Sequence, residues 1–148
     1  MRIALLHDML PFRERESDHL AKRCIRELRT LGHDARLVRT PAVDADSARL
    51  LAASLVIRGA ERVIGLSFPA SLMAAPGAER IIWALDCAPS EETEADFRQM
   101  LSASRLYGSS ALLCRRMEES TGLRSVLLGA PALDDEAGWR AVAEELAS

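Results

Sequence analysis

The chain has 148 residues, of which 49% are apolar and 28% are charged, and its formal net charge is −3. This composition is that of an ordinary globular protein, which excludes a disordered chain, and the length predicts a single domain over 1–148. The longest near-continuous apolar stretch, 50–57, is too short to cross a bilayer, and 1–6 leads directly into His7 and Asp8 instead of a longer apolar signal sequence.

The cysteines point to a reducing compartment. Cys24, Cys87 and Cys114 are odd in number and share no Cys-x-x-Cys spacing, which argues against a disulfide framework and a zinc ribbon. We therefore expect a cytoplasmic protein. We also expect no bound cofactor, and no metal, because His19 and His33 have no partner at ligand spacing. The small excess of basic residues in the first half of the chain is too weak to indicate nucleic-acid binding.

Short apolar runs alternate with helical patterns along the whole chain. The first run, 2–6, predicts a buried strand, and the helix after it is predicted to begin at Asp18 as its N-cap and to end at Gly32. Further strands are predicted at 35–38, 63–66, 81–85, 105–107 and 125–128. Further helices are predicted at 44–59, from 89 to about 102, from Ser109 or Ser110 to about 120, and from Asp134 onward. The last of these has an apolar face formed by Trp139, Val142, Ala143 and Leu146.

This alternation predicts the fold class. Strands that are apolar throughout are typical of a parallel sheet that is buried on both faces. We expect one doubly wound, Rossmann-like α/β domain, with a mostly parallel sheet of about six strands and helices on both faces. Such sheets bind ligands beyond the carboxyl ends of their strands, so candidate functional residues should follow the strands.

The segment after the first strand lacks a glycine-rich phosphate loop. It reads PFRERESD over 11–18, and without glycine its backbone cannot easily approach a pyrophosphate, which disfavours dinucleotide binding and phosphoryl transfer by a P-loop. Arg13 and Arg15 could contact an anionic ligand, or the segment could be a solvated loop.

Several side chains that can titrate are expected at the same sheet edge. His7 and Asp8 end the first strand, and Asp86 and Cys87 follow the fourth. A histidine beside a carboxylate can act as a base, and two carboxylates can share acid–base work or ligate magnesium. The alternative is structural, because polar residues at strand ends also cap loops. Cys24 and Cys114 are expected in the core.

Three stretches carry a family resemblance. The first is MRIALLHD at 1–8 with LRTLGHDA at 28–35, the second is VIGLSFPA at 63–70 with IIWAL at 81–85, and the third is YGSSALLCRRM at 107–117 with LLGAP at 127–131. In this order they resemble the N-terminal domain of family 4 glycosyltransferases, which have the GT-B fold. The resemblance covers about residues 1–133, and 134–148 resembles the closing helix of complete members.

The resemblance implies the acceptor-side half of a split glycosyltransferase, or a non-catalytic homologue that acts as a binding or partner module, because the domain that binds the nucleotide sugar is absent. The implied partners are a donor-domain subunit or a second copy, and a saccharide or another hydroxyl-rich acceptor. His7, Asp8 and Asp86 would then serve as base, orienting carboxylate and second carboxylate. The expected acceptor-binding residues are Arg13, Arg15, Ser67, Phe68, Ser109 and Ser110.

One alternative function stays open. The chain could be a stand-alone, flavodoxin-like enzyme that acts on a small molecule through Asp8 and Asp86, with or without a divalent metal. A bound metal would favour this alternative, whereas self-association or a co-purifying partner would favour the split glycosyltransferase.

Overall fold

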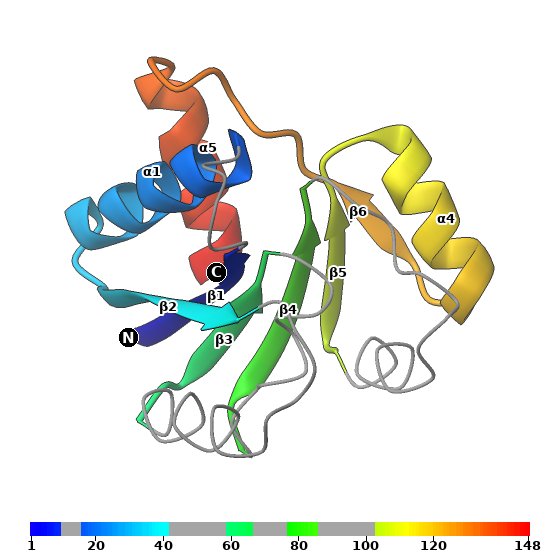
Figure 1. Cartoon of the computed structure of the whole chain (residues 1–148), viewed down its shortest axis with the longest axis horizontal. Coiled ribbons are helices and arrows are strands. Elements are labelled where there is room, and N and C mark those ends of the chain that lie inside the picture. The colour runs from blue at the N-terminus through cyan, green and yellow to red at the C-terminus, as the bar shows by residue number, and fades with distance from the viewer. Residues whose placement is uncertain (10–15, 42–58, 67–76, 86–102) are drawn as a thin grey trace.

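A computed structural model describes residues 1–9, 16–41, 59–66, 77–85 and 103–148. These residues form an open sheet of parallel strands in the order β2-β1-β3-β4-β5-β6, with helices packed on it (Figure 1). The elements are β1 (Arg2–Met9), α1 (Glu16–Thr30), β2 (Asp34–Pro41), β3 (Arg62–Gly65), β4 (Glu79–Ala84), β5 (Arg105–Gly108), α4 (Ala111–Thr121), β6 (Ser125–Leu127) and α5 (Glu136–Ala147).

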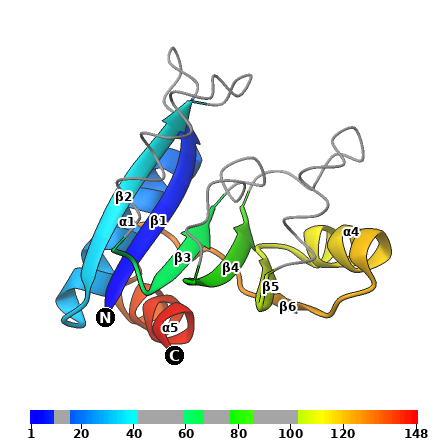
Figure 2. The ribbon, with the colours of Figure 1, turned by 90° about the horizontal axis from the view of Figure 1, so that it is seen from below.

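Both faces of the sheet are apolar and carry helices, which confirms the predicted fold class. Because successive strand residues point to opposite faces, β4 places Ile81 and Trp83 on one face and Ile82 and Ala84 on the other. The first face packs against α1 and α5, and the second packs against Met117 and its neighbours on α4. Figure 2 shows α5 beneath the sheet and α4 at the end formed by β5 and β6.

The first strand, β1, is longer than its apolar run. β1 pairs with β2 from Arg2 opposite Asp34 to Met9 opposite Pro41, so the ladder continues three residues beyond the predicted end at residue 6. The reason is that backbone pairing depends on a partner strand and not on the hydropathy of the residue. β1 therefore carries His7 inside the ladder, near its carboxyl end.

The helix ends follow local chemistry, with two corrections. Gly32, at a φ of +91°, ends the turn after α1, and Ser110 caps α4 by accepting a hydrogen bond from the backbone N–H of Leu113 (3.2 Å), both as predicted. Asp18 is not a cap, because α1 already begins at Glu16. The last helix, α5, begins at Glu136 and not at Asp134, and its cap is Asp135, whose carboxylate accepts from the N–H of Gly138 (2.9 Å).

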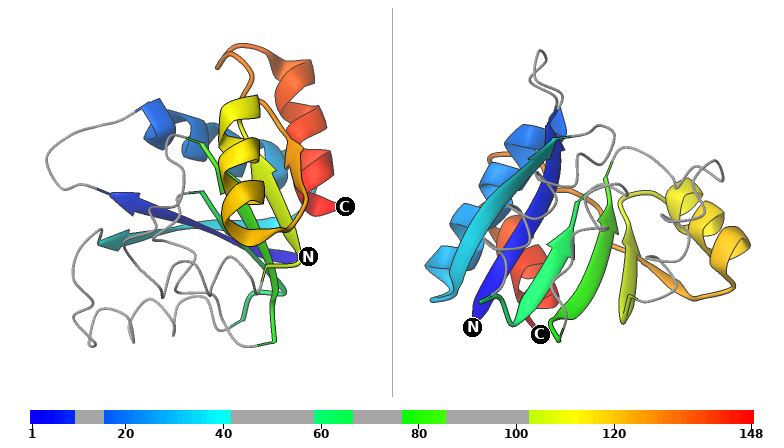
Figure 3. Two further views of the ribbon diagram at one scale, coloured as in Figure 1. Left: turned by 90° about the vertical axis from the view of Figure 1, so that its right-hand side faces the viewer. Right: turned by 60° about the horizontal axis from the view of Figure 1, so that its bottom comes forward.

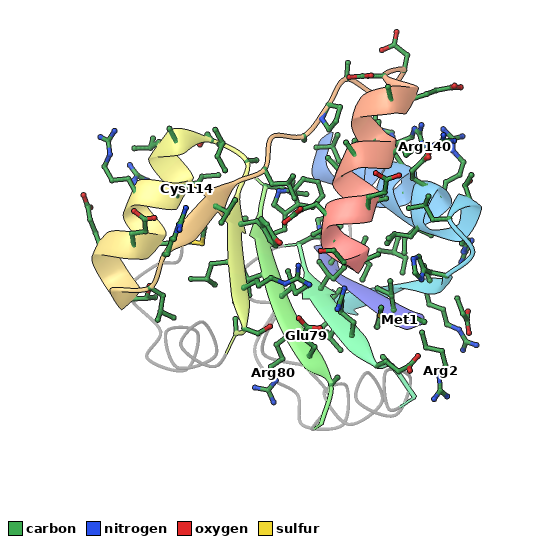
Figure 4. The ribbon with its side chains drawn as sticks, turned by 180° about the vertical axis from the view of Figure 1, so that it is seen from behind. Met1, Arg2, Glu79, Arg80, Cys114 and Arg140 are labelled. Carbon is green, nitrogen blue, oxygen red and sulfur yellow. The ribbon has the colours of Figure 1, made fainter. Side chains whose placement is uncertain are left out.

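The last helix returns to the face that α1 covers, and the predicted apolar face of Trp139, Val142, Ala143 and Leu146 is buried there. Arg23 and Glu27 of α1 form a buried ion pair (2.8 Å), and Arg140 of α5 lies 3.8 Å from the same carboxylate (Figure 4). These contacts join α5 to α1 where the two helices cross.

The predicted helices at 44–59 and 89–102 fall almost entirely outside the described residues. Among the helices that the structure does describe, none combines the length and the apolar character needed to cross a membrane.

Candidate functional site

The strand order locates the candidate site. From β1 the chain moves to β2 on one side and then to β3 on the other, so the order reverses at β1 (Figure 3). In open parallel sheets, a crevice for ligands forms at this point, outside the carboxyl ends of the strands. The described residues at this edge include His7 to Met9 at the end of β1, Leu66 after β3, Leu85 after β4 and the segment 108–110 at the end of β5.

A buried ionisable pair lies at the carboxyl end of β1. The Nε2 atom of His7 donates a hydrogen bond to Oδ1 of Asp18, and the two residues are only 1% and 3% exposed. The bond joins β1 to the first turn of α1. Because an ionised carboxylate only accepts, the proton of this hydrogen bond belongs to Nε2.

Asp18 therefore places a carboxylate beside His7, the kind of neighbour that the sequence interpretation expected in Asp8. Asp8 lies in the ladder opposite Thr40, and Asp86 lies outside the described residues, so their roles stay predictions. A sequence signal for Asp18 does exist. The first turn of a helix that directly follows a buried strand lies near the carboxyl end of that strand, and Asp18 belongs to that turn.

The two serines before α4 make contacts within the protein. Ser109 donates its hydroxyl to the carbonyl of Leu85 (2.8 Å), which ties the end of β5 to the end of β4, and the hydroxyl of Ser110 caps α4. Both lie at the expected sheet edge. The other predicted acceptor-binding residues, Arg13, Arg15, Ser67 and Phe68, fall outside the described residues.

Two of the cysteines are buried in the core, as predicted. Burial raises the pKa of Cys24 to about 12, so its thiol is not a nucleophile at neutral pH. Cys114 of α4 (Figure 4) packs on β5, with its Sγ 3.7 Å from the carbonyl oxygen of Gly108. Cys87 lies outside the described residues. Within the described ranges, no three histidine, cysteine, aspartate or glutamate side chains are grouped closely enough to hold a metal ion.

No family model matches the sequence, and no curated protein matches it. The solved structures that it is similar to include a flavodoxin of Streptococcus pneumonia TIGR4, with 14% identity, a TM-score of 0.46, and coverage of 99% of this chain and 98% of that one. A short-chain flavodoxin associated with a bacterial microcompartment matches at 10% identity and a TM-score of 0.47, over 99% and 97% of the two chains. A flavodoxin variant from Pseudomonas aeruginosa matches at 14% identity and a TM-score of 0.42, over 99% and 95%.

The interpretation as a family 4 glycosyltransferase domain is wrong. The similar structures are flavodoxins and not GT-B proteins, so the assignments as a transferase and as half of a split glycosyltransferase are withdrawn. The three stretches that carried the resemblance are not specific to glycosyltransferases, because they contain features that any doubly wound sheet needs. Gly32 ends a helix, Gly108 allows a close approach of helix and strand, and Ser110 caps a helix. The strand order β2-β1-β3-β4-β5, extended by β6, is the flavodoxin-like one.

Proposed function

We propose that the protein is a flavodoxin-like, stand-alone enzyme that binds a small anionic molecule at the carboxyl edge of its sheet, beside β1. The observation that carries the proposal is the hydrogen bond between His7 and Asp18, two ionisable residues that are almost fully buried at the point where the strand order reverses.

Burying such a pair costs free energy that an apolar pair of the same size does not cost. The neighbours of His7 on this face of β1, Ile3 and Leu5, belong to the apolar core, so packing alone does not require a histidine there. A buried hydrogen bond does make the floor of a site rigid, because each group fixes the orientation of the other. In the proposal, His7 and Asp18 are positioning residues beneath the ligand.

The contacts to the ligand come from the carboxyl end of β1 and from residues that follow the strands. Asp8 and Asp86 supply carboxylates for acid–base work, and Arg13 and Arg15 supply the positive charge that selects an anion. Reduced, buried Cys24 and Cys114 support a cytoplasmic location for this activity.

Ligand titrations followed by NMR test the proposal. Inorganic phosphate, a nucleoside monophosphate and flavin mononucleotide are added separately, each with and without magnesium. We expect at least one probe to shift the ring resonances of His7 and the amide resonances of 108–110, with a dissociation constant on the order of 10 µM. The amide resonances at the amino end of β2 should stay unchanged.

Asp86→Asn should weaken that binding by roughly tenfold, which corresponds to about 1.4 kcal/mol. Asp134→Asn, a substitution of an exposed residue before α5, is the matched control and should leave binding unchanged. If no probe shifts these resonances at millimolar concentration, or if the shifts lie elsewhere in the sheet, the proposed function is wrong.

A further inference from the structure

A second surface lies on the outer side of α1, away from the edge discussed above. It is a groove of about 580 Å³ between α1 and β2, lined by Lys22, Ile25, Arg26, Arg29, Thr30 and Leu37. Its floor is apolar, because Ile25 and Leu37 both pack against the core. Every charged side chain that lines it is cationic.

The groove runs beside an open edge of the sheet. In the described part of the chain, β2 pairs with β1 on one side and with no strand on the other. The N–H of Asp34 donates to the carbonyl of Met1 (3.0 Å), so the backbone groups of Asp34 point toward β1. Because the backbone groups of successive residues alternate in direction, those of Ala35, Leu37 and Arg39 point outward, away from β1. Arg29 confirms this direction, because its Nε donates to the carbonyl of Ala35 (2.8 Å) from outside the sheet.

Such an edge is a template for another strand, since its outward N–H and C=O groups can continue the ladder. Arg29 covers the carbonyl of Ala35 near the start of β2, which leaves the backbone groups of Leu37 and Arg39 toward its end. An added strand would direct alternate side chains to the face that carries α1, where the groove lies.

The charges of α1 determine which strand fits. Lys22, Arg26 and Arg29 are spaced by four and three residues, so they lie on one side of the helix, the side that lines the groove. Among the acidic side chains of α1 that the structure describes, Asp18 contacts His7, and Glu27 contacts Arg23 and Arg140; neither lines the groove. The groove therefore complements carboxylates.

We propose that the edge of β2 and this groove bind an extended acidic segment of a partner protein by strand addition. The segment pairs with the backbone of Leu37 and Arg39, places an apolar side chain over Ile25 and Leu37, and directs flanking carboxylates toward Arg26 and Arg29. Nucleic acid fits less well, because it cannot continue a backbone ladder and the groove offers no aromatic side chain for base stacking. This inference is independent of the proposed small-molecule site.

The probe is a capped ten-residue peptide of alternating glutamate and valine, titrated at 0.15 M salt so that unspecific attraction between exposed charges is screened. We expect a dissociation constant on the order of 100 µM and amide shifts centred on Leu37 and Arg39. A matched peptide of alternating lysine and valine should not bind. The acidic peptide with N-methyl groups at alternate residues keeps its charge but cannot pair, and it should bind at least tenfold more weakly.

The charge of the groove is tested by Arg26→Glu. This substitution lies on the exposed side of α1 and should weaken binding of the acidic peptide by roughly tenfold, because it replaces an attraction by a repulsion. Arg116→Glu, on the exposed side of α4, is the matched control and should have no effect.

Three results would each overturn the proposal. Equal binding of the N-methylated peptide would show that charge alone attracts the peptide, without strand pairing. Equal binding of the lysine peptide would show that the groove does not select carboxylates. Association of the chain with itself along β2, detected by sedimentation and by the same amide shifts at rising protein concentration, would assign the edge to a second copy.

Discussion

The indole rings of Trp83 in β4 and Trp139 in α5 meet edge to face, with their centroids 6.4 Å apart and their planes at 67°. Both rings are completely buried. Each indole N–H donates to the connection between β6 and α5, from Trp83 to the carbonyl of Leu128 (2.8 Å) and from Trp139 to that of Ala132 (2.9 Å). The two rings therefore hold the last helix, and the connection before it, on the middle of the sheet.

Removing one of these rings should be costly. We expect Trp139→Ala to lower the free energy of unfolding by about 3–5 kcal/mol, because the substitution opens a cavity in the core and removes the contact to Trp83. Urea denaturation followed by far-UV circular dichroism measures the change. Leu127→Ala, at a side chain that is 61% exposed, should change the same free energy by less than about 0.5 kcal/mol. A loss below about 1 kcal/mol for Trp139→Ala would mean that α5 is not part of the core cover.

Gly108 is the point of closest approach between β5 and α4. A β-carbon there would lie 2.7 Å from Sγ and 2.8 Å from the backbone nitrogen of Cys114, and a helix backbone cannot move aside as a side chain can. We expect Gly108→Ala to lower the free energy of unfolding by roughly 1–3 kcal/mol through overpacking. Thermal or urea denaturation tests this.

Gly129→Ala is the matched control. A β-carbon at Gly129 would meet only the carbonyl oxygen of Ser109, at an ordinary 3.9 Å, and its φ is not positive. The variant should be as stable as the wild type. If Gly108→Ala is equally well tolerated, α4 does not pack on β5 as closely as described.

The middle of the sheet could be predicted from the sequence because β3, β4 and β5 are buried on both faces. The runs at 63–66, 81–85 and 105–107 fall within a residue or two of β3, β4 and β5. The predictions failed where a residue far along the chain decides the outcome. β1 continues through His7 because β2 pairs with it, and nothing in the hydropathy of β1 reveals that partner.

The candidate site could be predicted only in part. The sequence indicates His7, because this residue follows an apolar run. It does not indicate that Asp18 is the partner of His7, because Asp18 also fits the local pattern of a helix cap. Only the tertiary structure distinguishes a cap from a hydrogen-bond partner of His7. The contacts among Arg62, Glu79 and Arg105 had no sequence signal, because the three residues begin three different strands and meet only when those strands pair.

The coupling between His7 and Asp18 can be measured. Asp18→Ala should lower the free energy of unfolding by about 1–3 kcal/mol, because it leaves a buried imidazole donor without its acceptor. His7→Ala should be costly as well, and the double variant should be less destabilised than the sum of the two. Chemical denaturation of all four proteins should give a coupling energy of roughly 0.5–3 kcal/mol. Additive effects would contradict the hydrogen bond on which the proposed function depends.

Glu79 lies at the centre of a charged network at the amino ends of the strands. Its Oε2 accepts from Nε (2.9 Å) and Nη2 (2.6 Å) of Arg62, and its Oε1 accepts from Nη2 of Arg105 (3.3 Å). The two arginines also donate to the end of α5, Arg62 to the carbonyl of Leu146 (2.8 Å) and Arg105 to that of Ser148 (3.0 Å). Cations at a helix carboxyl end are favourable, so Glu79 holds in place the two groups that anchor α5.

This network predicts a pH dependence of stability. Partial burial raises the pKa of Glu79, but the hydrogen bond and charge of Arg62, together with the charge of Arg105, outweigh it, and the pKa lies below its ordinary value of 4.5. A carboxylate whose pKa is lower in the folded protein adds stability above its unfolded pKa and loses that stability as the pH falls through the folded value.

We therefore expect Glu79→Gln to lower the free energy of unfolding by roughly 1 kcal/mol at pH 7, a modest amount because solvent screens a side chain that is 35% exposed. The difference from the wild type should shrink as the pH falls below 4.5. Urea denaturation between pH 7 and pH 3 measures it, with Glu119→Gln on the exposed side of α4 as a control that should show no such difference. A difference that stays constant over this range would show that the ionised carboxylate of Glu79 does not stabilise the junction between the strands and α5.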